Sequence, residues 1–154
     1  IIFTNTPDTP PPPPPRVGRF TGGGWQTVNG VRIKIAFTLH CDIILSNNLE
    51  INWPAANGRT NQFHMLQHTS AVCTDDLTIE QRPPAAPVDR IDGVGTGRYN
   101  GDLGYTVEFT LIDAGEPGTA DSIGFRPMDS NNPTAMLRLF RNGDSEAVLF
   151  QQFR

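Results

Sequence analysis

The sequence predicts an all-β domain, an antiparallel β-sandwich or flattened barrel of about nine or ten short strands. Apolar and polar residues alternate over several runs, as they do in half-buried strands. Asn-Gly pairs, which are the strongest short signal for a tight hairpin, follow several of these runs. Glycine and proline, with 15 and 14 of the 154 residues, interrupt the chain too often for long helices.

The first fifteen residues differ from the rest of the chain. The first five predict a short extended strand, since isoleucine and phenylalanine favour the pleated environment of a sheet: Ile1, Ile2, Phe3, Thr4 and Asn5. A run of prolines follows shortly after and predicts a stiff linker: Pro10, Pro11, Pro12, Pro13, Pro14 and Pro15. We therefore divide the chain into an arm, residues 1–15, and a single β domain, residues 16–154.

In the first part of the β domain, residues 17–20 predict a short strand that ends at a run of three glycines, where a bulge or a close backbone approach is expected. Residues 26–28 then meet Asn29-Gly30, which predicts a hairpin into residues 31–41. Alternate residues of that strand are apolar and should face the core: Val31, Ile33, Ile35, Phe37, Leu39 and Cys41.

Residues 47–53 and 61–69 predict the next two strands, joined by a turn that contains Asn-Gly, and residues 71–73 continue beyond them. Strict alternation over residues 61–69 puts His64 and His68 on one side and about 13 Å apart, too far to chelate one metal ion. We therefore expect exposed or capped histidines. Residues 74–89 predict a long irregular connection, with a helix within residues 74–92 as the alternative.

The second half of the domain repeats the same pattern. Residues 93–99 form a glycine-rich strand, and residues 105–111 form the clearest alternating strand of the chain, after an intervening Asn-Gly turn. A further strand is expected at residues 122–126. Residues 135–140 and 147–153 then complete the domain as a last pair joined by another Asn-Gly turn.

The net charge of −4 and the pI of about 5.2 argue against a nucleic-acid partner and against an anionic membrane surface. No run is long and apolar enough to span a bilayer. The chain has no GxSxG or HExxH motif, and its triple glycine is not followed by the Lys-Ser/Thr of a phosphate loop. We therefore expect no enzyme activity and no cofactor.

The chain has two cysteines, Cys41 and Cys73. An even pair in a β domain predicts a disulfide, which would close a loop of about 33 residues. Two buried free thiols in a cytosolic protein are the alternative. Because the sequence starts at Ile1 without a leader, we expect a removed signal peptide and an extracellular or cell-surface location.

One group of acidic residues, Asp113, Glu116 and Asp121, could supply oxygen ligands to calcium. Their spacing does not match an EF-hand loop, and Pro117-Gly118 fits a type II turn without a metal. The turn is the favoured interpretation, so we expect no metal here.

Three large aromatic residues, Trp25, Trp53 and Tyr99, could form a platform on which a sugar stacks. Large aromatic side chains of a small β domain more often belong to its core. We therefore expect these three residues in the core, with carbohydrate binding as the alternative.

Three segments match a known pattern: Arg19-Phe-Thr-Gly-Gly-Gly-Trp25, then Phe37-Thr-Leu-His-Cys-Asp42 with Asn47-Asn-Leu-Glu50, and Gly95-Thr-Gly-Arg-Tyr-Asn-Gly101 through Asp113-Ala-Gly-Glu-Pro-Gly-Thr119. Together they resemble the post-choice-of-anchor domain, a β module of secreted and often multidomain bacterial proteins. They span nearly the whole β domain and none of the arm. The resemblance implies a bacterial exported protein with a disulfide between Cys41 and Cys73, and it implies no catalytic activity.

The favoured function is that of an extracellular structural subunit. Residues 1–5 would insert as a strand into the sheet of a neighbouring copy, with the prolines as a spacer, and a contact of this kind that does not close into a ring builds a filament. The alternative is a monomeric secreted cell-surface module that binds carbohydrate or another ligand through its loops. For the arm itself, a plain spacer or packing on its own domain is the competing interpretation.

Overall fold

The computed structural model describes residues 17–77, 87–113, 135–144 and 146–153. These residues form eight strands, and no helix occurs among them, so the all-β prediction is confirmed for this part of the chain. The strands are β1 (Arg19–Val28), β2 (Val31–His40), β3 (Asn48–Pro54), β4 (Thr60–Thr74), β5 (Arg90–Tyr99), β6 (Asp102–Ile112), β7 (Ala135–Arg141) and β8 (Ala147–Phe153).

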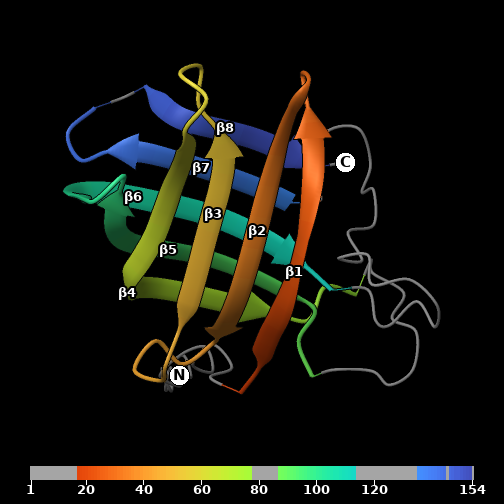
Figure 1. Cartoon of the computed structure of the whole chain (residues 1–154). Coiled ribbons are helices and arrows are strands. Elements are labelled where there is room, and N and C mark those ends of the chain that lie inside the picture. Colours follow the sequence, from red (N-terminus) through yellow and green to blue (C-terminus); the bar gives the residue numbers. More distant parts are fainter. Residues whose placement is uncertain (1–16, 78–86, 114–134, 145, 154) are drawn as a thin grey trace, which may run out of the picture.

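The strands form one antiparallel sheet in which each strand pairs with the next along the chain, from β1 to β8. The sheet curls into a half-barrel. Figure 1 shows β1, β2 and β3 in front of β5, β6, β7 and β8, which cross behind them, while β4 runs from the front layer into the back layer. The core therefore lies between two halves of a single curled sheet.

The corner of the half-barrel is β4, the longest strand with 15 residues. Its pairing with β5 shifts register twice, between Met65 and Gln67 and between His68 and Ser70. Such bulges bend a strand and increase its twist, which allows the first part of β4 to pair in the front layer and the second part in the back layer.

Apolar side chains from both layers fill the space between them. The buried hydrophobic residues are Phe20, Ile33, Ile35, Phe37, Leu39, Cys41, Leu49, Ile51, Trp53, Phe63, Met65, Cys73, Val88, Ile91, Val107, Phe109, Leu111, Ile112, Leu137 and Leu139. The predicted core face of β2 is thus confirmed except at Val31, which is 37% exposed because it directly follows the hairpin turn.

The glycine run does not interrupt β1, so the separate strands expected at residues 17–20 and 26–28 are in fact parts of one. Gly22, Gly23 and Gly24 pair in register with Phe37, Ala36 and Ile35 of β2. The ring of Phe37 lies close to Gly22, where an added Cβ would approach its Cζ to 2.9 Å. Glycine is therefore used here to admit a core side chain against an edge strand.

Other strand predictions also change. Residues 61–69 and 71–73 belong to the single strand β4. This merger is one reason why the described residues form eight strands and not the nine or ten that were predicted. The described part of residues 74–92 contains no helix. The arm (residues 1–15), the strand expected at residues 122–126 and most of the connection after β4 lie outside the described residues.

Candidate functional site

The first candidate site is the pair of sheet edges. Within the described residues β1 pairs with β2 alone and β8 pairs with β7 alone, so one side of each backbone is left open. An open edge offers a row of hydrogen-bonding groups to another strand. The residues predicted to donate such a strand, Ile1 to Asn5, lie outside the described part of the chain together with the proline linker.

The predicted disulfide is confirmed, and the alternative of two free thiols is wrong. Cys41 and Cys73 are bonded, with their Cα atoms 5.8 Å apart, and both are buried. The bond joins the residue after β2 in the front layer to the part of β4 that pairs with β5 in the back layer. It therefore ties the two layers together at one end of the half-barrel.

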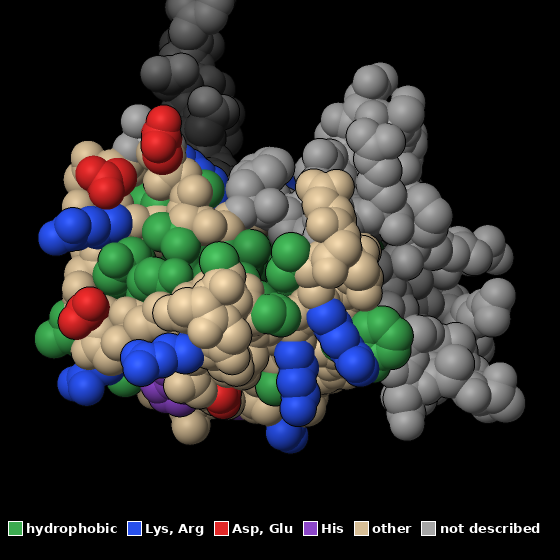
Figure 2. Space-filling view, turned by 45° about the horizontal axis from the view of Figure 1, so that its top comes forward, with side chains coloured by type: hydrophobic (Ala, Val, Ile, Leu, Met, Phe, Trp, Pro, Cys, Tyr) green, Lys and Arg blue, Asp and Glu red, His purple; other side chains and the backbone are tan. Residues whose placement is uncertain are grey.

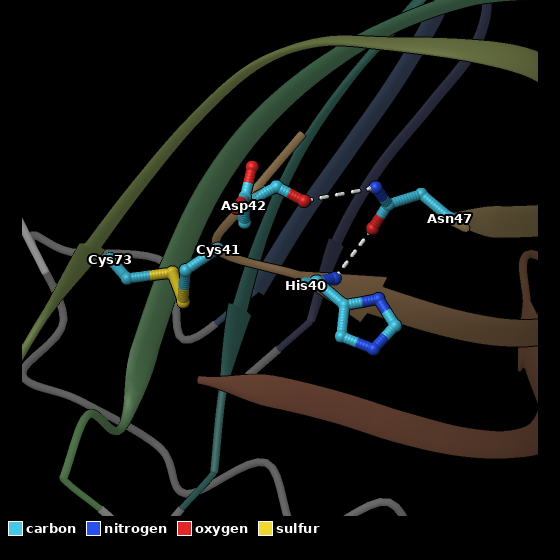
Figure 3. The surroundings of a disulfide bond; sticks show 5 residues. All are labelled: His40, Cys41, Asp42, Asn47 and Cys73. Carbon is cyan, nitrogen blue, oxygen red and sulfur yellow. Dashed lines mark hydrogen bonds between the residues drawn. A yellow bond between two sulfur atoms is a disulfide. The ribbon is translucent and has the colours of Figure 1, made fainter. Parts of the chain in front are cut away.

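The loop between β2 and β3 begins at this disulfide and is held by Asn47 (Figure 3). The Asn47 Oδ1 atom accepts a hydrogen bond from the backbone N–H of His40 at 2.5 Å. Its Nδ2 atom donates to the backbone carbonyls of Asp42 at 3.3 Å and of Leu45 at 2.9 Å. These bonds hold a turn that exposes apolar side chains, with Ile44 85% exposed.

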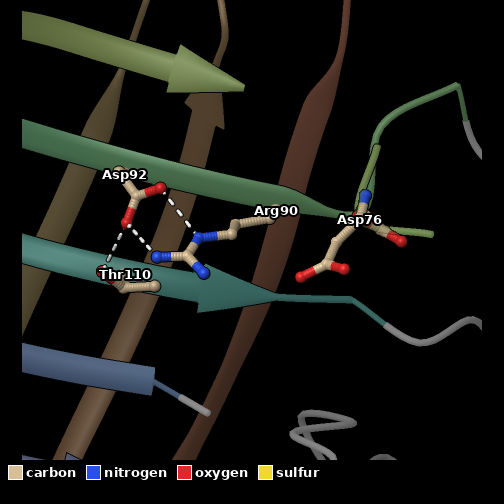
Figure 4. Close-up of polar contacts among 5 residues, drawn as sticks. Asp76, Arg90, Asp92 and Thr110 are labelled. Atoms are coloured by element: carbon tan, nitrogen blue, oxygen red, sulfur yellow. Dashed lines mark hydrogen bonds and ion pairs between the residues drawn. The ribbon is translucent and has the colours of Figure 1, made fainter. Parts of the chain in front are cut away.

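A charged cluster lies on the back layer near the same end (Figure 4). Arg90 donates from Nε to Asp92 Oδ2 at 2.8 Å and from Nη2 to Asp92 Oδ1 at 3.0 Å, and the Thr110 hydroxyl donates to the same carboxylate at 2.7 Å. The hydrogen bond to Asp92 is the main cause that raises the pKa of Arg90, and the carboxylates of Asp76 and Asp89 add to it. An arginine guanidinium keeps its charge in proteins, so the cluster is suited to holding two strands together rather than to proton transfer.

Of the three candidate calcium ligands, Asp113 lies within the described residues. Asp113 is exposed, and its backbone N–H donates to the carbonyl of Asp89 at 2.7 Å. Glu116 and Asp121 lie outside the part that the structure describes. Among the residues that it does describe, no three His, Cys, Asp or Glu side chains are grouped so that they could hold a metal ion.

The two histidines of β4 do not share a side, contrary to the prediction. His64 is exposed, whereas His68 is 4% exposed and its ring lies against Phe109, with 5.7 Å between the ring centroids. The register shift between Met65 and Gln67 inserts a residue into the alternation, which turns His68 toward the core.

Burial is the main cause that lowers the pKa of His68 below the ordinary value of 6.5, and the charge on His40 lowers it further. A contact with the backbone of Ser70 acts in the opposite direction. Because the unfolded chain binds this proton more tightly, the folded state is destabilised as the pH falls below 6.5 toward the lower pKa of the folded protein. The neutral imidazole is thus the form that the core accepts.

We expect the free energy of unfolding to fall by at most about 1.4 kcal/mol for each pH unit of this range. His68→Gln should remove that part of the pH dependence, because it removes the titrating group. Urea unfolding at pH 5.0, 6.0 and 7.5 measures the effect. The matched control is His64→Gln, an exposed histidine on the same strand, and an equal loss of pH dependence in both variants would contradict the assignment.

The aromatic residues divide into two groups. Trp53 is buried, as predicted, and stacks on Tyr99 with 5.6 Å between the ring centroids; Tyr105 contacts Tyr99 in turn at 5.0 Å. Trp25 does not belong to the core and is 62% exposed, so the core prediction is wrong for this residue. Its place on the outer side of β1 makes it available for contact with a ligand.

The described residues contain no helix of the length and apolar character that crossing a membrane requires. Comparison of the chain with protein-family models, with curated proteins and with solved structures gives no match.

Proposed function

We propose that this protein is an extracellular structural subunit, without catalytic activity, that assembles into a filament by strand donation. Residues 1–5 of one copy would add to an open edge of the next copy, and the six prolines would set the distance between subunits. In this proposal the half-barrel belongs to a sandwich or flattened barrel of nine or ten strands, to which residues 122–126 contribute.

The observation that carries the proposal is the composition of the open edge strands. Natural proteins protect exposed edges with lysine, proline or inward-facing charges. β8 has the sequence AVLFQQF without charge or proline, and β1 has the sequence RFTGGGWQTV with Arg19 as its single charge. A strand with the composition of β8 is strongly prone to pair, so a partner strand is expected to cover it.

We favour β8 as the acceptor because it is the less charged of the two edges and is seven residues long, which accommodates a five-residue donor. The Cys41–Cys73 disulfide supports an oxidising compartment outside the cytosol, since disulfides persist there. The resemblance to the post-choice-of-anchor module agrees with export by a bacterium and belongs to the same proposal.

Deletion of residues 1–5 is the experiment that tests the proposal. The full chain should form filaments that negative-stain electron microscopy detects, whereas the truncated chain should remain monomeric, because each copy has lost the strand that its neighbour accepts. The circular dichroism spectrum and the disulfide should be unchanged, which separates lost assembly from lost folding.

A second test adds the donor segment back to the truncated protein as a separate peptide of residues 1–9. Added to the truncated protein, it should fill the acceptor edge and raise the melting temperature, since a ligand of the folded state stabilises it. The same peptide with Phe3→Asp should have no effect, because a buried carboxylate is strongly unfavourable. Monomeric full-length protein, or equal effects of the two peptides, would contradict strand donation.

A further inference from the structure

The outer side of the front layer carries an exposed aromatic residue beside a cation. The guanidinium of Arg32 lies 4.0 Å from the centroid of the Trp25 ring, yet Trp25 remains 62% exposed. Arg32 and Trp25 come from adjacent strands, and the hairpin register places them on the same side of the sheet. An arginine at this distance is held by cation–π attraction while its N–H groups stay free to bind an anion.

Positive charge extends from this pair across the front layer. The pairing of β1 with β2 places Lys34 beside Trp25. In the neighbouring row, which continues from β4 into β5 of the back layer, Arg98 lies beside His64. Within the described residues neither Arg32 nor Lys34 forms an ion pair. In a chain with a net charge of −4, this side of the front layer is therefore locally basic. Figure 2 shows Lys and Arg side chains projecting from the visible surface, with Asp and Glu side chains among them.

The acidic residue of these rows, Glu50, is already engaged by amide groups. Gln62 Nε2 donates to Glu50 Oε1 at 2.6 Å, and Asn52 Nδ2 donates to the same oxygen at 3.4 Å. Asn52 and Gln62 lie in the same row as Trp25 and Lys34. The donors of both amides point to Glu50, which orients their carbonyl oxygens as acceptors for other groups.

The row formed by Trp25, Lys34, Asn52 and Gln62 has side chains of the kinds that bind polysaccharides. It crosses four neighbouring strands and is about 14 Å long, because adjacent strands lie about 4.8 Å apart. The row contains an aromatic ring, a cation and two amides, in that order. A pyranose ring stacks its C–H groups on an aromatic face, amides pair with hydroxyl groups, and arginine binds a carboxylate or sulfate through parallel N–H donors.

We propose that the outer face of β1 to β4 binds an anionic polysaccharide, in which pyranose rings carry carboxylate or sulfate groups. Trp25 stacks on a ring, Arg32 and Lys34 bind its anionic group, and Asn52 and Gln62 accept hydrogen bonds from the next rings. The binding site is independent of strand donation, because it uses the face of β1 and not its open edge.

Oligosaccharides with matched charge test the ligand class. The probes are oligogalacturonate with its methyl-esterified, uncharged form, and dextran sulfate with unmodified dextran, each titrated by calorimetry. We expect at least one charged member to bind about tenfold or more tightly than its neutral match, with binding weakened by salt. The preferred pair identifies carboxylate or sulfate as the anion. Equal binding of charged and neutral forms, or no binding of either charged form, overturns the proposal.

Variants locate the site. Trp25→Ala should weaken binding about tenfold, and Arg32→Gln and Lys34→Gln should each weaken it several-fold. Arg141→Gln, an exposed arginine of β7, removes the same charge elsewhere and should leave the affinity within about twofold. Because Trp53 is buried, bound ligand should protect mainly the Trp25 fluorescence from acrylamide quenching.

Unchanged affinity in Trp25→Ala, or an equal loss in Arg141→Gln, would overturn the proposed site. The same protein samples also test whether this face binds a membrane or a second copy of the chain. Stronger binding to vesicles of anionic phospholipid than to any glycan, or self-association that Trp25→Ala abolishes, would assign the face to a membrane or to a second copy instead.

Discussion

Replacing both cysteines, in Cys41→Ala with Cys73→Ala, is expected to lower the free energy of unfolding by about 3–4 kcal/mol. The disulfide joins residues 32 positions apart, so its loss restores considerable conformational freedom to the unfolded chain. A domain of this size has a total stability of about 5–15 kcal/mol, which makes the loss a large fraction of the whole. Urea unfolding followed by circular dichroism measures it.

Reducing agent provides the control for this experiment. The unmodified protein in reductant should approach the stability of the double variant, and reductant should change the double variant itself very little. A double variant as stable as the oxidised protein would contradict the stabilising role of the disulfide.

The sequence allowed the strands and several turns to be predicted because both depend on local chemistry. Alternation identifies a strand with one buried side, and Asn-Gly identifies a hairpin turn that needs left-handed backbone. Both residues of the first such turn have positive φ, 50° at Asn29 and 78° at Gly30. The disulfide was also predictable, since the chain offers a single pair of cysteines.

The outward position of Trp25 could also be predicted from the sequence, by working out the register of its hairpin. A two-residue turn at Asn29-Gly30 pairs Trp25 with Lys34, and Lys34 lies between the buried residues Ile33 and Ile35. Trp25 must therefore share the outer side with the lysine. The general preference of tryptophan for the core was a weaker guide than the register of its own hairpin.

The orientation of His68 was not predictable in the same way. The register shift between Met65 and Gln67 decides it, and this shift arises where the sheet turns from the front layer into the back layer. A bulge of this kind is set by packing across the whole sheet, which local alternation does not report. Two glycines of the neighbouring strand β5, Gly95 and Gly97, lie against β4 at this corner, whereas the space at Gly93 is occupied by the ring of Phe109.

Gly97 lies where β5 passes closest to this corner. An added Cβ would stand 2.1 Å from the backbone carbonyl oxygen of His64, and backbone atoms cannot move aside as a flexible side chain can. Gly97→Ala is therefore expected to lower the free energy of unfolding by about 3 kcal/mol, near the upper end of the range for overpacked sites. Urea unfolding measures the loss.

Thr96→Ala is the matched control, because Thr96 is the adjacent residue of β5 and is only partly buried. Its change should stay within about 1 kcal/mol, since it adds no atom to the corner. At Gly95 a Cβ would lie 2.2 Å from the Sδ atom of Met65 and 2.9 Å from the backbone carbonyl oxygen of Gln67. Alanine should be tolerated better there than at Gly97, because the closest contact is a flexible side chain and the backbone contact is longer than the 2.1 Å at Gly97. If Gly97→Ala were no more harmful than either variant, the curl of the sheet would not depend on backbone contact at β4.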